Sequence, residues 1–452
     1  MELKGKRVLL VGLAKTGVST IKCLAEKGAD ITVNDIKTED KLKDIINEIS
    51  DIEGIKYILG HHPEDISGVD IVVVSPGVPL DLPFIEKVKK EGIYLIGEVE
   101  LAYQIADEPY FIGITGTNGK TTTTSLTGEI FEAAGKETYV VGNIGNPVID
   151  AAKDASKGAS YVTELSSFQL ESIDSFRPKV SAVLNVTEDH MNRHHTMENY
   201  IAAKARVFEN QKEEDFCVLN YDDETTRNLA KDCKSKVVFF SRKEKPEGGI
   251  YLDENNNIII AVSGNEEVLM NAKELSLPGG HNLENCMAAA AMAYVSGIDM
   301  DVIRHILKTF KAVEHRLEFT RERNGVIYVN DSKGTNPDST IKAVQAYENP
   351  IILIAGGYDK GSVFDELLEI AKENVRTLIL MGVTADTIEE CARKHGFEDI
   401  YRVNNMKEAV EKAEAVSKEG DVVLLSPACA SWDMYKCFED RGNDFKENVN
   451  RL

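Results

Sequence analysis

Short apolar runs alternate with amphipathic stretches along most of the chain, a pattern typical of α/β proteins. The apolar run at 7–11 predicts a buried strand, residues 12–17 a tight turn, and residues 18–27 a helix. Two further strands are predicted at 31–34 and 71–75. This order of elements predicts one small Rossmann-like unit at the start of the chain.

The same alternation begins twice more. A second unit opens with a strand at 110–114, and short strands and turns between 217 and 273 predict a β-rich edge to its sheet. A third unit starts near His315. Its strands are predicted at 326–330, 351–355, 377–381 and 421–426.

The glycine-rich loop after the strand at 110–114 has the features of a phosphate-binding loop. It runs Gly113-Ile-Thr-Gly116-Thr-Asn-Gly119-Lys120-Thr121-Thr122 and leads into a helix. Glycines let backbone N–H groups approach phosphate oxygens, and a helix N-terminus carries a partial charge of about +0.5. Lys120 can reach the terminal phosphates and Thr121 can bind Mg²⁺. The common spacing GxxxxGK[ST] needs glycine where this chain has Ile114, so the loop departs from it.

We therefore predict an α/β protein with three domains. At roughly 150 residues per domain, a chain of 452 residues agrees with that number. Residues 1–98 would form a Rossmann-like N-terminal domain, residues 99–310 a central P-loop ATPase-like domain, and residues 311–452 a Rossmann-like C-terminal domain.

Charge and cysteine content narrow the function. The net charge of -23 argues against nucleic acid or an anionic membrane as the main partner. Seven scattered cysteines without a CxxC pair favour a reducing compartment, with no disulfide framework. No apolar run is long enough to span a bilayer, and the N-terminus lacks a secretory signal. We expect a cytoplasmic protein with no membrane insertion.

Three side chains near predicted strand ends could complete a Mg²⁺ site beside the phosphate loop. Glu164 ends a strand predicted at 161–165, and His190 follows a strand predicted at 180–186. Carboxyl ends of parallel strands meet at one edge of a sheet, so these side chains are expected to lie close together. The neighbouring His194 and His195 are expected to be exposed.

The third candidate, Lys204, falls in the apolar stripe of a helix predicted at 198–209. On pattern alone, the favoured interpretation is a lysine that extends along the stripe and keeps its ammonium group in water. An ammonium group would repel Mg²⁺, since the reference pKa of lysine is about 10.4. A metal role for Lys204 therefore requires its carbamylation by CO₂, which supplies carboxylate-like oxygens.

Eight motifs in order along the chain together resemble the Mur ligase family. They are Gly116-Thr-Asn-Gly-Lys-Thr-Thr122, Glu164-Leu-Ser-Ser-Phe-Gln-Leu-Glu171, Asn185-Val-Thr-Glu-Asp-His190, Lys204, His281-Asn-Leu-Glu-Asn285, Glu314-His-Arg316, Asn330-Asp-Ser-Lys-Gly-Thr-Asn336 and Leu425-Ser-Pro-Ala-Cys-Ala-Ser431. Ser75-Pro-Gly-Val78 and Phe438-Glu-Asp-Arg-Gly442 are similar to members that add D-glutamate. The Asp-Asn-Pro-Arg motif of diaminopimelate-adding members is absent.

The resemblance implies ATP-dependent ligation of D-glutamate to UDP-N-acetylmuramoyl-L-alanine, in peptidoglycan precursor synthesis. An acyl phosphate formed from ATP would be attacked by the D-glutamate amine. ATP and Mg²⁺ would be required, Lys204 would be carbamylated, and we expect a monomer.

The resemblance also implies roles position by position. ATP would be held by Gly116, Thr117, Asn118, Gly119, Lys120, Thr121, Thr122, Asn282, Asn285, Arg316 and Asp331. Mg²⁺ would be held by Thr121, Glu164, His190 and carbamylated Lys204. Thr16, Asp35 and Gly77 would line the uridine site, with Asn143 nearer the muramoyl group, and D-glutamate would meet Lys333, Thr335, Lys360, Ser431 and Phe438. The catalytic group would be Lys120, His190, Lys204 and Lys333.

Three alternatives remain open. Folylpolyglutamate synthases share a related loop and glutamate ligation, but they lack a Rossmann-like unit ahead of the loop. A non-catalytic nucleotide-binding relative would have no need of Lys333, Lys360 and Ser431 as an amino-acid pocket. A dehydrogenase would rest on Gly12-Leu-Ala-Lys-Thr-Gly17, which lacks the middle glycine that admits a dinucleotide pyrophosphate.

Overall fold

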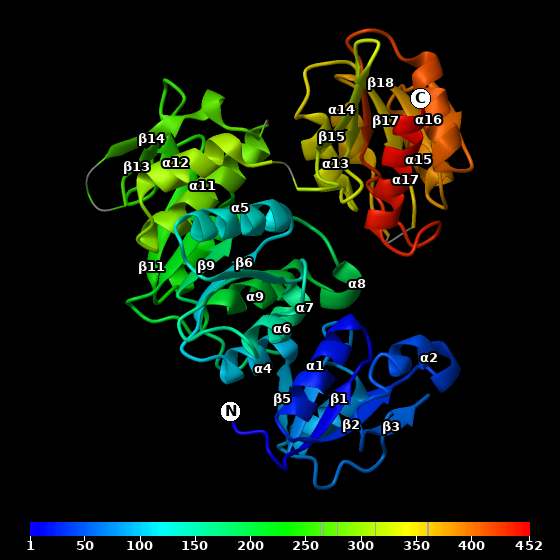
Figure 1. The fold of residues 1–452 in the computed structure, drawn as a ribbon. Helices are drawn as coiled ribbons and strands as arrows, with labels where there is room; N and C mark the ends of the chain where they lie inside the picture. Colours follow the sequence, from blue (N-terminus) through cyan, green and yellow to red (C-terminus); the bar gives the residue numbers. More distant parts are fainter. Residues whose placement is uncertain (263, 265, 278, 312, 359–360) are drawn as a thin grey trace. The chain divides into compact units, whose positions relative to one another are not determined.

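The structure, a computed structural model, describes residues 1–452 apart from 263, 265, 278, 312 and 359–360. Its strands form three separate sheets (Figure 1). Packing divides the chain into two compact units, Met1–Glu274 with Glu284–Thr309 and Leu275–Leu283 with Phe310–Leu452. The predicted α/β class is confirmed, whereas the domain boundaries at 98 and 310 stay a prediction. Within the described part of the chain, no helix is both long and apolar enough to cross a membrane.

The N-terminal sheet is parallel, with the strand order β3-β2-β1-β4-β5. Its strands are β1 (Arg7–Val11), β2 (Asp30–Asp35), β3 (Lys56–Leu59), β4 (Ile71–Val74) and β5 (Tyr94–Gly97). Its helices are α1 (Lys15–Glu26), α2 (Glu39–Asn47) and α3 (Pro83–Lys90). Successive residues of a strand face opposite sides, so Leu10 packs in the cluster with α1 and Leu9 in the cluster with α3.

Helix α1 begins at Lys15, inside the segment predicted as a turn, so the predicted helix start at residue 18 is wrong. The turn itself is confined to the residues after β1, where Gly12 has a φ of 94°. Gly17 is the reason that the helix can begin early. A Cβ there would lie 2.9 Å from the Gly12 carbonyl oxygen, so glycine permits the close approach of helix and loop.

The central sheet has nine strands in the order β14-β13-β12-β11-β10-β9-β6-β8-β7. They are β6 (Tyr110–Thr115), β7 (Thr138–Gly142), β8 (Ser160–Glu164), β9 (Val180–Val183), β10 (Phe216–Asn220), β11 (Lys236–Ser241), β12 (Ile250–Leu252), β13 (Asn257–Ile260) and β14 (Glu267–Asn271). Strands β6 to β12 run parallel to one another. Strand β13 pairs antiparallel with both β12 and β14. The predicted β-rich edge is thus present.

Helices α4 (Glu98–Ile105), α5 (Lys120–Ala133), α6 (Val148–Ala152), α7 (Ser167–Leu170), α8 (Met191–His194), α9 (Met197–Ala205), α10 (Glu224–Leu229), α11 (Gly280–Val295) and α12 (Met300–Thr309) accompany this sheet. Short 3₁₀ turns follow at Arg206–Phe208, Ala230–Asp232 and Ala272–Glu274. Helix α5 packs on β7 and β8 and against α12. The phosphate loop therefore joins a buried strand to a packed helix.

The C-terminal sheet has the order β15-β16-β20-β17-β18-β19, with only β15 antiparallel to its neighbour among the described strands. Its strands are β15 (Glu318–Arg323), β16 (Val326–Asn330), β17 (Ile351–Ala355), β18 (Val375–Leu380), β19 (Ile400–Arg402) and β20 (Val422–Leu425). Its helices are α13 (Pro337–Val344), α14 (Asp365–Ala371), α15 (Ala385–Lys394), α16 (Met406–Val416) and α17 (Phe438–Arg451).

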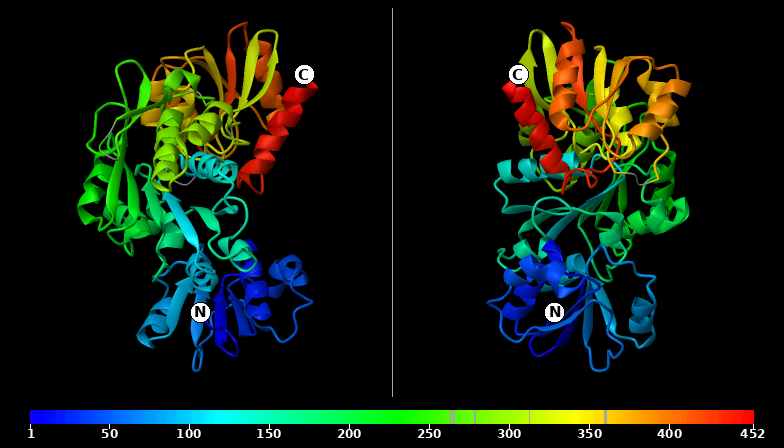
Figure 2. Two further views of the ribbon diagram at one scale, coloured as in Figure 1. Left: turned by 60° about the vertical axis from the view of Figure 1, so that its left-hand side comes forward. Right: turned by 90° about the vertical axis from the view of Figure 1, so that its right-hand side faces the viewer.

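Helices cover both faces of this sheet (Figures 1 and 2). Helices α13, α14 and α15 share one apolar cluster with it, and α16 and α17 share another. The middle strands β16, β20 and β17 are neighbours and run parallel, so the segments that follow them emerge at one edge. Those segments contain Lys333, Ser431 and Gly357, three positions far apart in the sequence.

Candidate active site

The phosphate loop has the backbone geometry that its glycines predict. Gly119 is the residue before α5 and has a φ of 83°, in the left-handed region that glycine adopts readily. A Cβ at this position would overlap the side-chain oxygen of Asn285. Asn285 itself is buried, and its oxygen accepts a hydrogen bond from Thr123 Oγ1 at 3.3 Å. The N-terminus of α5 is thereby held against α11.

Both lysines predicted for the ATP and Mg²⁺ sites reach the same loop carbonyl. Lys120 Nζ donates to the carbonyl oxygens of Gly116 and Thr117 at 2.9 and 2.8 Å. Lys204 Nζ donates to the Gly116 oxygen at 2.8 Å and lies 4.4 Å from the centre of the Tyr200 ring. The interpretation of Lys204 as a solvent-seeking lysine is therefore wrong. Its side chain is only 1% exposed and points into the protein.

Burial has a direct effect on the charge of Lys204. The pKa of its ammonium group lies well below the usual range, chiefly because burial penalises the charged form. The nearby charge of Lys120 lowers this pKa further, and Asp189 opposes the shift. Lys204 is thus held in conditions that favour the neutral amine, the form that reacts with CO₂.

Glu164 lies at the carboxyl end of β8 and is 1% exposed. Its Oε1 accepts a hydrogen bond from Asn143 Nδ2 at 2.8 Å, and its backbone oxygen accepts one from Asn143 N at 2.9 Å. The other carboxylate oxygen, Oε2, is buried and has no hydrogen-bond partner among the described residues. Because an orphaned buried carboxylate oxygen is costly, this oxygen suits a cation such as Mg²⁺.

The segment after β9 is tied to the phosphate loop by reciprocal hydrogen bonds. Thr117 Oγ1 donates to the Thr187 carbonyl at 3.0 Å, and Thr187 N donates back to Thr117 Oγ1 at 3.0 Å. Asn118 N donates to Asn185 Oδ1 at 2.8 Å, and Asn185 Nδ2 donates to the Asn118 carbonyl at 3.1 Å. These hydrogen bonds join the segment that ends at His190 to the phosphate loop.

His190 lies at the start of α8 and has a φ of 59°, a conformation that non-glycine residues rarely adopt. Its ring makes an edge contact with Phe168, with centroids 5.0 Å apart. The prediction for His194 is wrong, because His194 is 4% exposed and its Nε2 lies 2.9 Å from Ser167 Oγ. His195 is exposed, as predicted.

Arg193 is a residue that sequence reasoning missed. Its Nη2 donates to the carbonyl of Val78 at 3.0 Å and to Glu171 Oε2 at 2.5 Å. Its guanidinium lies 5.1 Å from the centre of the Phe168 ring. Arg193 therefore connects the Ser75–Val78 segment of the N-terminal sheet to the segment that carries His190.

The residues predicted for the uridine site gather where the segments after β1, β2 and β4 meet. Asp35 ends β2, and its two oxygens accept hydrogen bonds from Leu13 N at 2.7 Å and Lys37 N at 2.8 Å. Ser75 Oγ donates to the Gly12 carbonyl at 2.7 Å. Thr16 is half-buried in α1, and Gly77 is exposed, with open space around it. The sheet edge at β1 and β4 is a topological switch point, where ligands bind in such folds.

In the C-terminal unit, Asp331 follows β16 and is fully buried. Its Oδ2 accepts a hydrogen bond from Ser426 Oγ at 2.7 Å and its Oδ1 one from Leu317 N at 3.2 Å. Arg316 Nη1 lies 3.8 Å from Asp331 Oδ1. Burial raises the pKa of Asp331 to about 6, and Arg316 opposes this shift. Asn282, a further predicted ATP residue, is buried at the start of α11.

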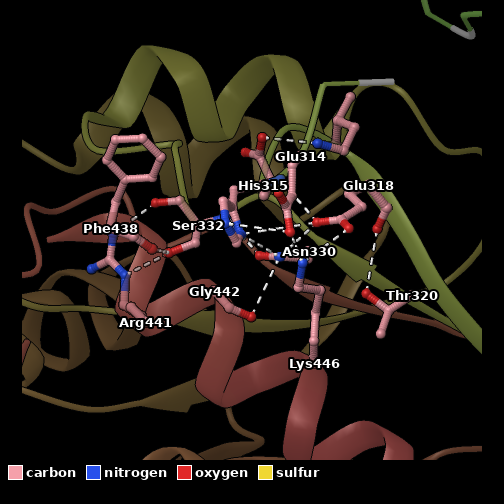
Figure 3. Close-up of polar contacts among 12 residues, drawn as sticks. Glu314, His315, Glu318, Thr320, Asn330, Ser332, Phe438, Arg441, Gly442 and Lys446 are labelled. Carbon is pink, nitrogen blue, oxygen red and sulfur yellow. Dashed lines mark hydrogen bonds and ion pairs between the residues drawn. The ribbon is translucent and has the colours of Figure 1, made fainter. Parts of the chain in front are cut away.

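Three of the residues predicted to meet D-glutamate are brought together. Lys333 Nζ lies 5.1 Å from the centre of the Phe438 ring, and Ser332 Oγ donates to the Phe438 carbonyl at 2.8 Å (Figure 3). Thr335 N donates to the Lys333 carbonyl at 2.9 Å. Ser431 is 2% exposed and ends the segment after β20. Lys360 lies outside the described residues.

The buried His315 packs against the segment that contains Lys333. The His315 carbonyl accepts a hydrogen bond from Lys333 N at 3.0 Å, and His315 Nδ1 lies 2.9 Å from Asn330 Nδ2. Lys446 makes ion pairs with Glu314 and, at 3.3 Å, with Glu318 (Figure 3). Burial and the charge of Lys446 lower the pKa of His315, which favours the neutral imidazole.

A second group of metal-binding side chain types lies elsewhere, on α14 and α15. Asp365, Cys391 and His395 present their ligand atoms within 4.8 Å of one another. His395 bonds to Glu369 Oε2 at 3.0 Å and Asp365 Oδ1 at 3.3 Å, so both ring nitrogens are engaged. We interpret the group as surface ion pairs between two helices.

Comparison with known proteins identifies the family. Residues 6–97 match the Mur ligase MurD-like N-terminal domain, residues 114–293 the Mur ligase middle domain, and residues 315–429 the Mur ligase glutamate ligase domain. The chain belongs to the Mur ligase family, and the predicted resemblance is confirmed.

Its full-length relatives carry one particular name. A protein of Clostridioides difficile (strain 630) named UDP-N-acetylmuramoylalanine--D-glutamate ligase is 66% identical over 452 residues, with 100% of both chains covered. A protein of the same name from Alkaliphilus oremlandii (strain OhILAs) is 51% identical over 455 residues, again with both chains fully covered.

Solved structures support the fold. MurF from Acinetobacter baumannii is similar with a TM-score of 0.63 at 16% identity, over 97% of this chain and 93% of that one. UDP-N-acetylmuramate-alanine ligase MurC from Thermotoga maritima gives a TM-score of 0.60 at 20% identity, over 98% and 99%. The three-domain architecture of the family is therefore shared.

Proposed function

We propose that the chain joins D-glutamate to UDP-N-acetylmuramoyl-L-alanine in an ATP-dependent ligation, a step of peptidoglycan precursor synthesis. The observation that carries this proposal is the full-length match, at 66% identity, to a ligase of that name. The phosphate loop and the buried carboxylate of Glu164 supply the local chemistry that ATP-driven ligation requires.

In the first step, a carboxylate oxygen of the UDP-linked substrate attacks the γ-phosphorus of ATP. The bond from that phosphorus to the ADP oxygen breaks, and an acyl phosphate and ADP result. Gly116 to Thr122 hold the phosphates through backbone N–H groups and the N-terminus of α5. Lys120 leaves the Gly116 and Thr117 carbonyls to pair with phosphate oxygens. Such transfers depend on positioning and charge neutralisation rather than on a covalent nucleophile.

Thr121, Glu164, His190 and Lys204 would hold Mg²⁺, which neutralises phosphate charge when bound. The unpartnered Oε2 of Glu164 supports this assignment. The ammonium form of Lys204 does not fit, since it would place a positive charge beside the cation.

Carbamylation of Lys204 resolves that conflict. The neutral amine attacks CO₂, a C–N bond forms, and one proton leaves to solvent, so a lysine becomes an anionic carbamate. The burial that lowers the pKa of Lys204 favours the neutral amine, the form that attacks CO₂. The carbamate oxygens would serve as ligands for Mg²⁺, where the ammonium group would repel it.

In the second step, the amine of D-glutamate attacks the acyl carbon, an amide bond forms, phosphate leaves and the amine loses a proton. Lys333, Thr335, Ser431 and Phe438 are the described residues assigned to the amino acid, together with Lys360. Asn282, Asn285, Arg316 and Asp331 are assigned to the nucleotide of ATP, and Thr16, Asp35, Gly77 and Asn143 to the UDP-linked substrate. A general base for the amine is not assigned.

A cytoplasmic location and a monomeric state are part of the proposal. All seven cysteines are free thiols, as suits a reducing compartment. The acidic composition and the nucleotide-activated substrates agree with a partner set of small molecules.

The test is ADP release with ATP, Mg²⁺ and UDP-N-acetylmuramoyl-L-alanine, with D-glutamate, L-glutamate, glycine, L-lysine or diaminopimelate added in turn. Turnover that depends on D-glutamate alone supports the proposal. Turnover with another amino acid keeps the ligase and changes its substrate. No turnover with any of them favours a folate-type ligase or a non-catalytic relative, and overturns the proposal.

A further inference from the structure

Arg441 lies in the first turn of α17 and is only 2% exposed. Its guanidinium donates four hydrogen bonds to two separate chain segments (Figure 3 shows those to Ser332). Nε donates to Ser332 Oγ at 3.0 Å, and Nη2 donates to the Ser332 carbonyl at 2.8 Å. Nη1 donates to the carbonyls of Cys429 and Ala430 at 3.1 and 3.3 Å.

These contacts are unusual for a buried arginine. Arginine is normally buried only with a carboxylate partner, because transfer of an unpaired charge out of water is expensive. No carboxylate of the described residues lies within ion-pair distance of Arg441, and its acceptors are backbone oxygens and one hydroxyl. Burial accordingly lowers the pKa of Arg441 to about 10. The free-energy cost of burying this guanidinium suggests that the geometry of the two segments it binds is important.

Both segments carry residues assigned to the amino-acid substrate. Ser332 directly precedes Lys333, and Ala430 directly precedes Ser431. Ser332 Oγ also donates to the carbonyl of Phe438, the first residue of α17. The guanidinium of Arg441 thus fixes the relative positions of three parts of the proposed pocket, which contain Lys333, Ser431 and Phe438.

A third segment is fitted around the same guanidinium. Gly357, after β17, has a φ of 151°, and a Cβ there would overlap the Ala430 carbonyl and lie 3.2 Å from Arg441 Nη1. Tyr358 N donates to the Ala430 carbonyl at 2.8 Å. The segment that leads to Lys360 therefore also depends on the place of Ala430, which Arg441 holds.

Resting on the function proposed above, we propose that Arg441 is a positioning residue for the amino-acid substrate. It fixes the spacing of the Lys333 segment and the Ser431 segment without touching the substrate. The nucleotide residue Asp331 is anchored independently, by Ser426 Oγ and by its own N–H, which donates to the Leu425 carbonyl at 2.7 Å. Loss of Arg441 therefore affects use of the amino acid before it affects use of ATP.

The decisive variant is Arg441→Lys, which keeps the charge and removes the planar fork. One ammonium nitrogen cannot reproduce four bonds to two segments. We expect the KM for D-glutamate to rise roughly 10- to 100-fold, as for one or two lost bonds from a charged donor, while the KM for ATP is unchanged. Arg451→Lys is the matched control, because Arg451 lies on the same helix, is exposed and pairs with Glu447.

Hydroxylamine separates the two half-reactions. It is a small amine that attacks acyl phosphates without an amino-acid pocket, giving a hydroxamate and phosphate. Wild type and Arg441→Lys should form hydroxamate from ATP and UDP-N-acetylmuramoyl-L-alanine at equal rates. If wild type forms no hydroxamate, the proposed function fails, and this result is independent of Arg441.

Three results would overturn the proposal for Arg441. The first is an unchanged KM for D-glutamate in Arg441→Lys. The second is a parallel loss of D-glutamate and hydroxylamine activities, which would mean a general structural role. The third concerns stability. If the thermal unfolding midpoint of Arg441→Lys falls together with all of its activities, Arg441→Gln is measured as a second variant. A folded Arg441→Gln with an unchanged KM for D-glutamate would then overturn the proposal.

Discussion

Lys120 and Lys204 donate hydrogen bonds to one oxygen, the carbonyl of Gly116, at 2.9 and 2.8 Å. Two ammonium groups on one acceptor repel each other, and the buried one is the easier to neutralise. Lys120 is half-buried at the mouth of the loop, and its charge contributes to the lowered pKa of Lys204. In the function proposed above, Lys120 is assigned to the ATP phosphates and Lys204 to carbamylation, so the two lysines on this carbonyl have different proposed roles.

Replacement of Lys120, the less buried of the two lysines, should remove ATP turnover. Lys120→Ala deletes the cation assigned to the terminal phosphates, and we expect ADP release to fall by at least about a hundredfold, in line with the loss of one strong charge contact in phosphoryl transfer. The thermal unfolding midpoint should stay near that of wild type. The exposed Lys136, just beyond α5, provides the control variant Lys136→Ala. Retained turnover in Lys120→Ala would remove the phosphate-loop assignment.

Lys204→Ala should lose activity and regain part of it when short carboxylic acids are added. The acid supplies the oxygens that the carbamate would supply, in the space left by the side chain. Lys120→Ala is the comparison, because no carboxylic acid can replace a cation there. Incorporation of ¹³CO₂ into wild type, followed by NMR, checks the modification itself. Absence of both rescue and label would leave Lys204 as an ordinary buried amine.

Glu164→Gln should weaken the use of Mg²⁺. The change keeps the hydrogen bond from Asn143 but removes the charge of the orphaned oxygen. We expect the Mg²⁺ concentration needed for half-maximal ADP release to rise by at least about tenfold, the lower end for disturbed metal sites. Glu132→Gln, on the exposed side of α5, is the control. An unchanged Mg²⁺ dependence would contradict the metal assignment of Glu164.

Two glycines with nearly the same backbone test the shape of the phosphate loop. Gly119 and Gly135 have φ of 83° and 76°, so alanine is strained at both by roughly 1 kcal/mol. Only at Gly119 would the new Cβ also meet Asn285 Oδ1, whereas Gly135 has open space. Gly119→Ala should therefore lower both stability and ATP affinity, and Gly135→Ala stability alone. Equal ATP affinities in the two variants would show that the contact with Asn285 is easily relaxed.

Glu98 predicts a pH dependence of stability. It is buried, its Oε1 accepts a hydrogen bond from Ile149 N at 2.6 Å, and burial raises its pKa from 4.5 to about 7. Because the folded pKa is the higher one, the contribution to stability is complete below about pH 4.5 and is lost as the pH rises to about 7. The loss is at most roughly 3 kcal/mol.

The measurement is the denaturation midpoint of wild type and Glu98→Gln between about pH 5 and about pH 8, a range that includes the titration of Glu98. The midpoint of wild type should fall as the pH rises, and that of Glu98→Gln should fall less. Glu53→Gln, at an exposed position, should follow wild type. Parallel curves for all three proteins would assign the pH dependence to other groups.

The strands were largely predictable, because their apolar runs are continuous and mostly buried. The predicted limits of β1, β16 and β17 agree with the structure residue for residue. The start of α1 was not predictable from the turn pattern, since Gly17 serves close packing rather than a turn. Sequence pattern identifies a glycine but not which of these two purposes it has.

Site residues were predictable where a motif carries them and unpredictable where a distant partner does. The burial of Lys204 depends on the Gly116 carbonyl, and that of His194 on Ser167, both contacts across the fold. Arg441 lies within the motif Phe438-Glu-Asp-Arg-Gly442 but was given no role, because α17 is mostly polar. A clue existed, since Arg441 lies four residues before Phe445 and eight before Val449, on the buried stripe of the helix.

The central and C-terminal sheets share no strand. The machinery that energises the carboxylate and the segments assigned to the incoming amine thus stand on different scaffolds, each with its own core. We expect substitutions at Thr335, Ser431 and Phe438 to change which amine is accepted, whereas Asp331, directly after β16, is assigned to the nucleotide of ATP. In a chimera that exchanges the C-terminal sheet between relatives, we therefore expect the choice of amine to follow the relative that supplies this sheet.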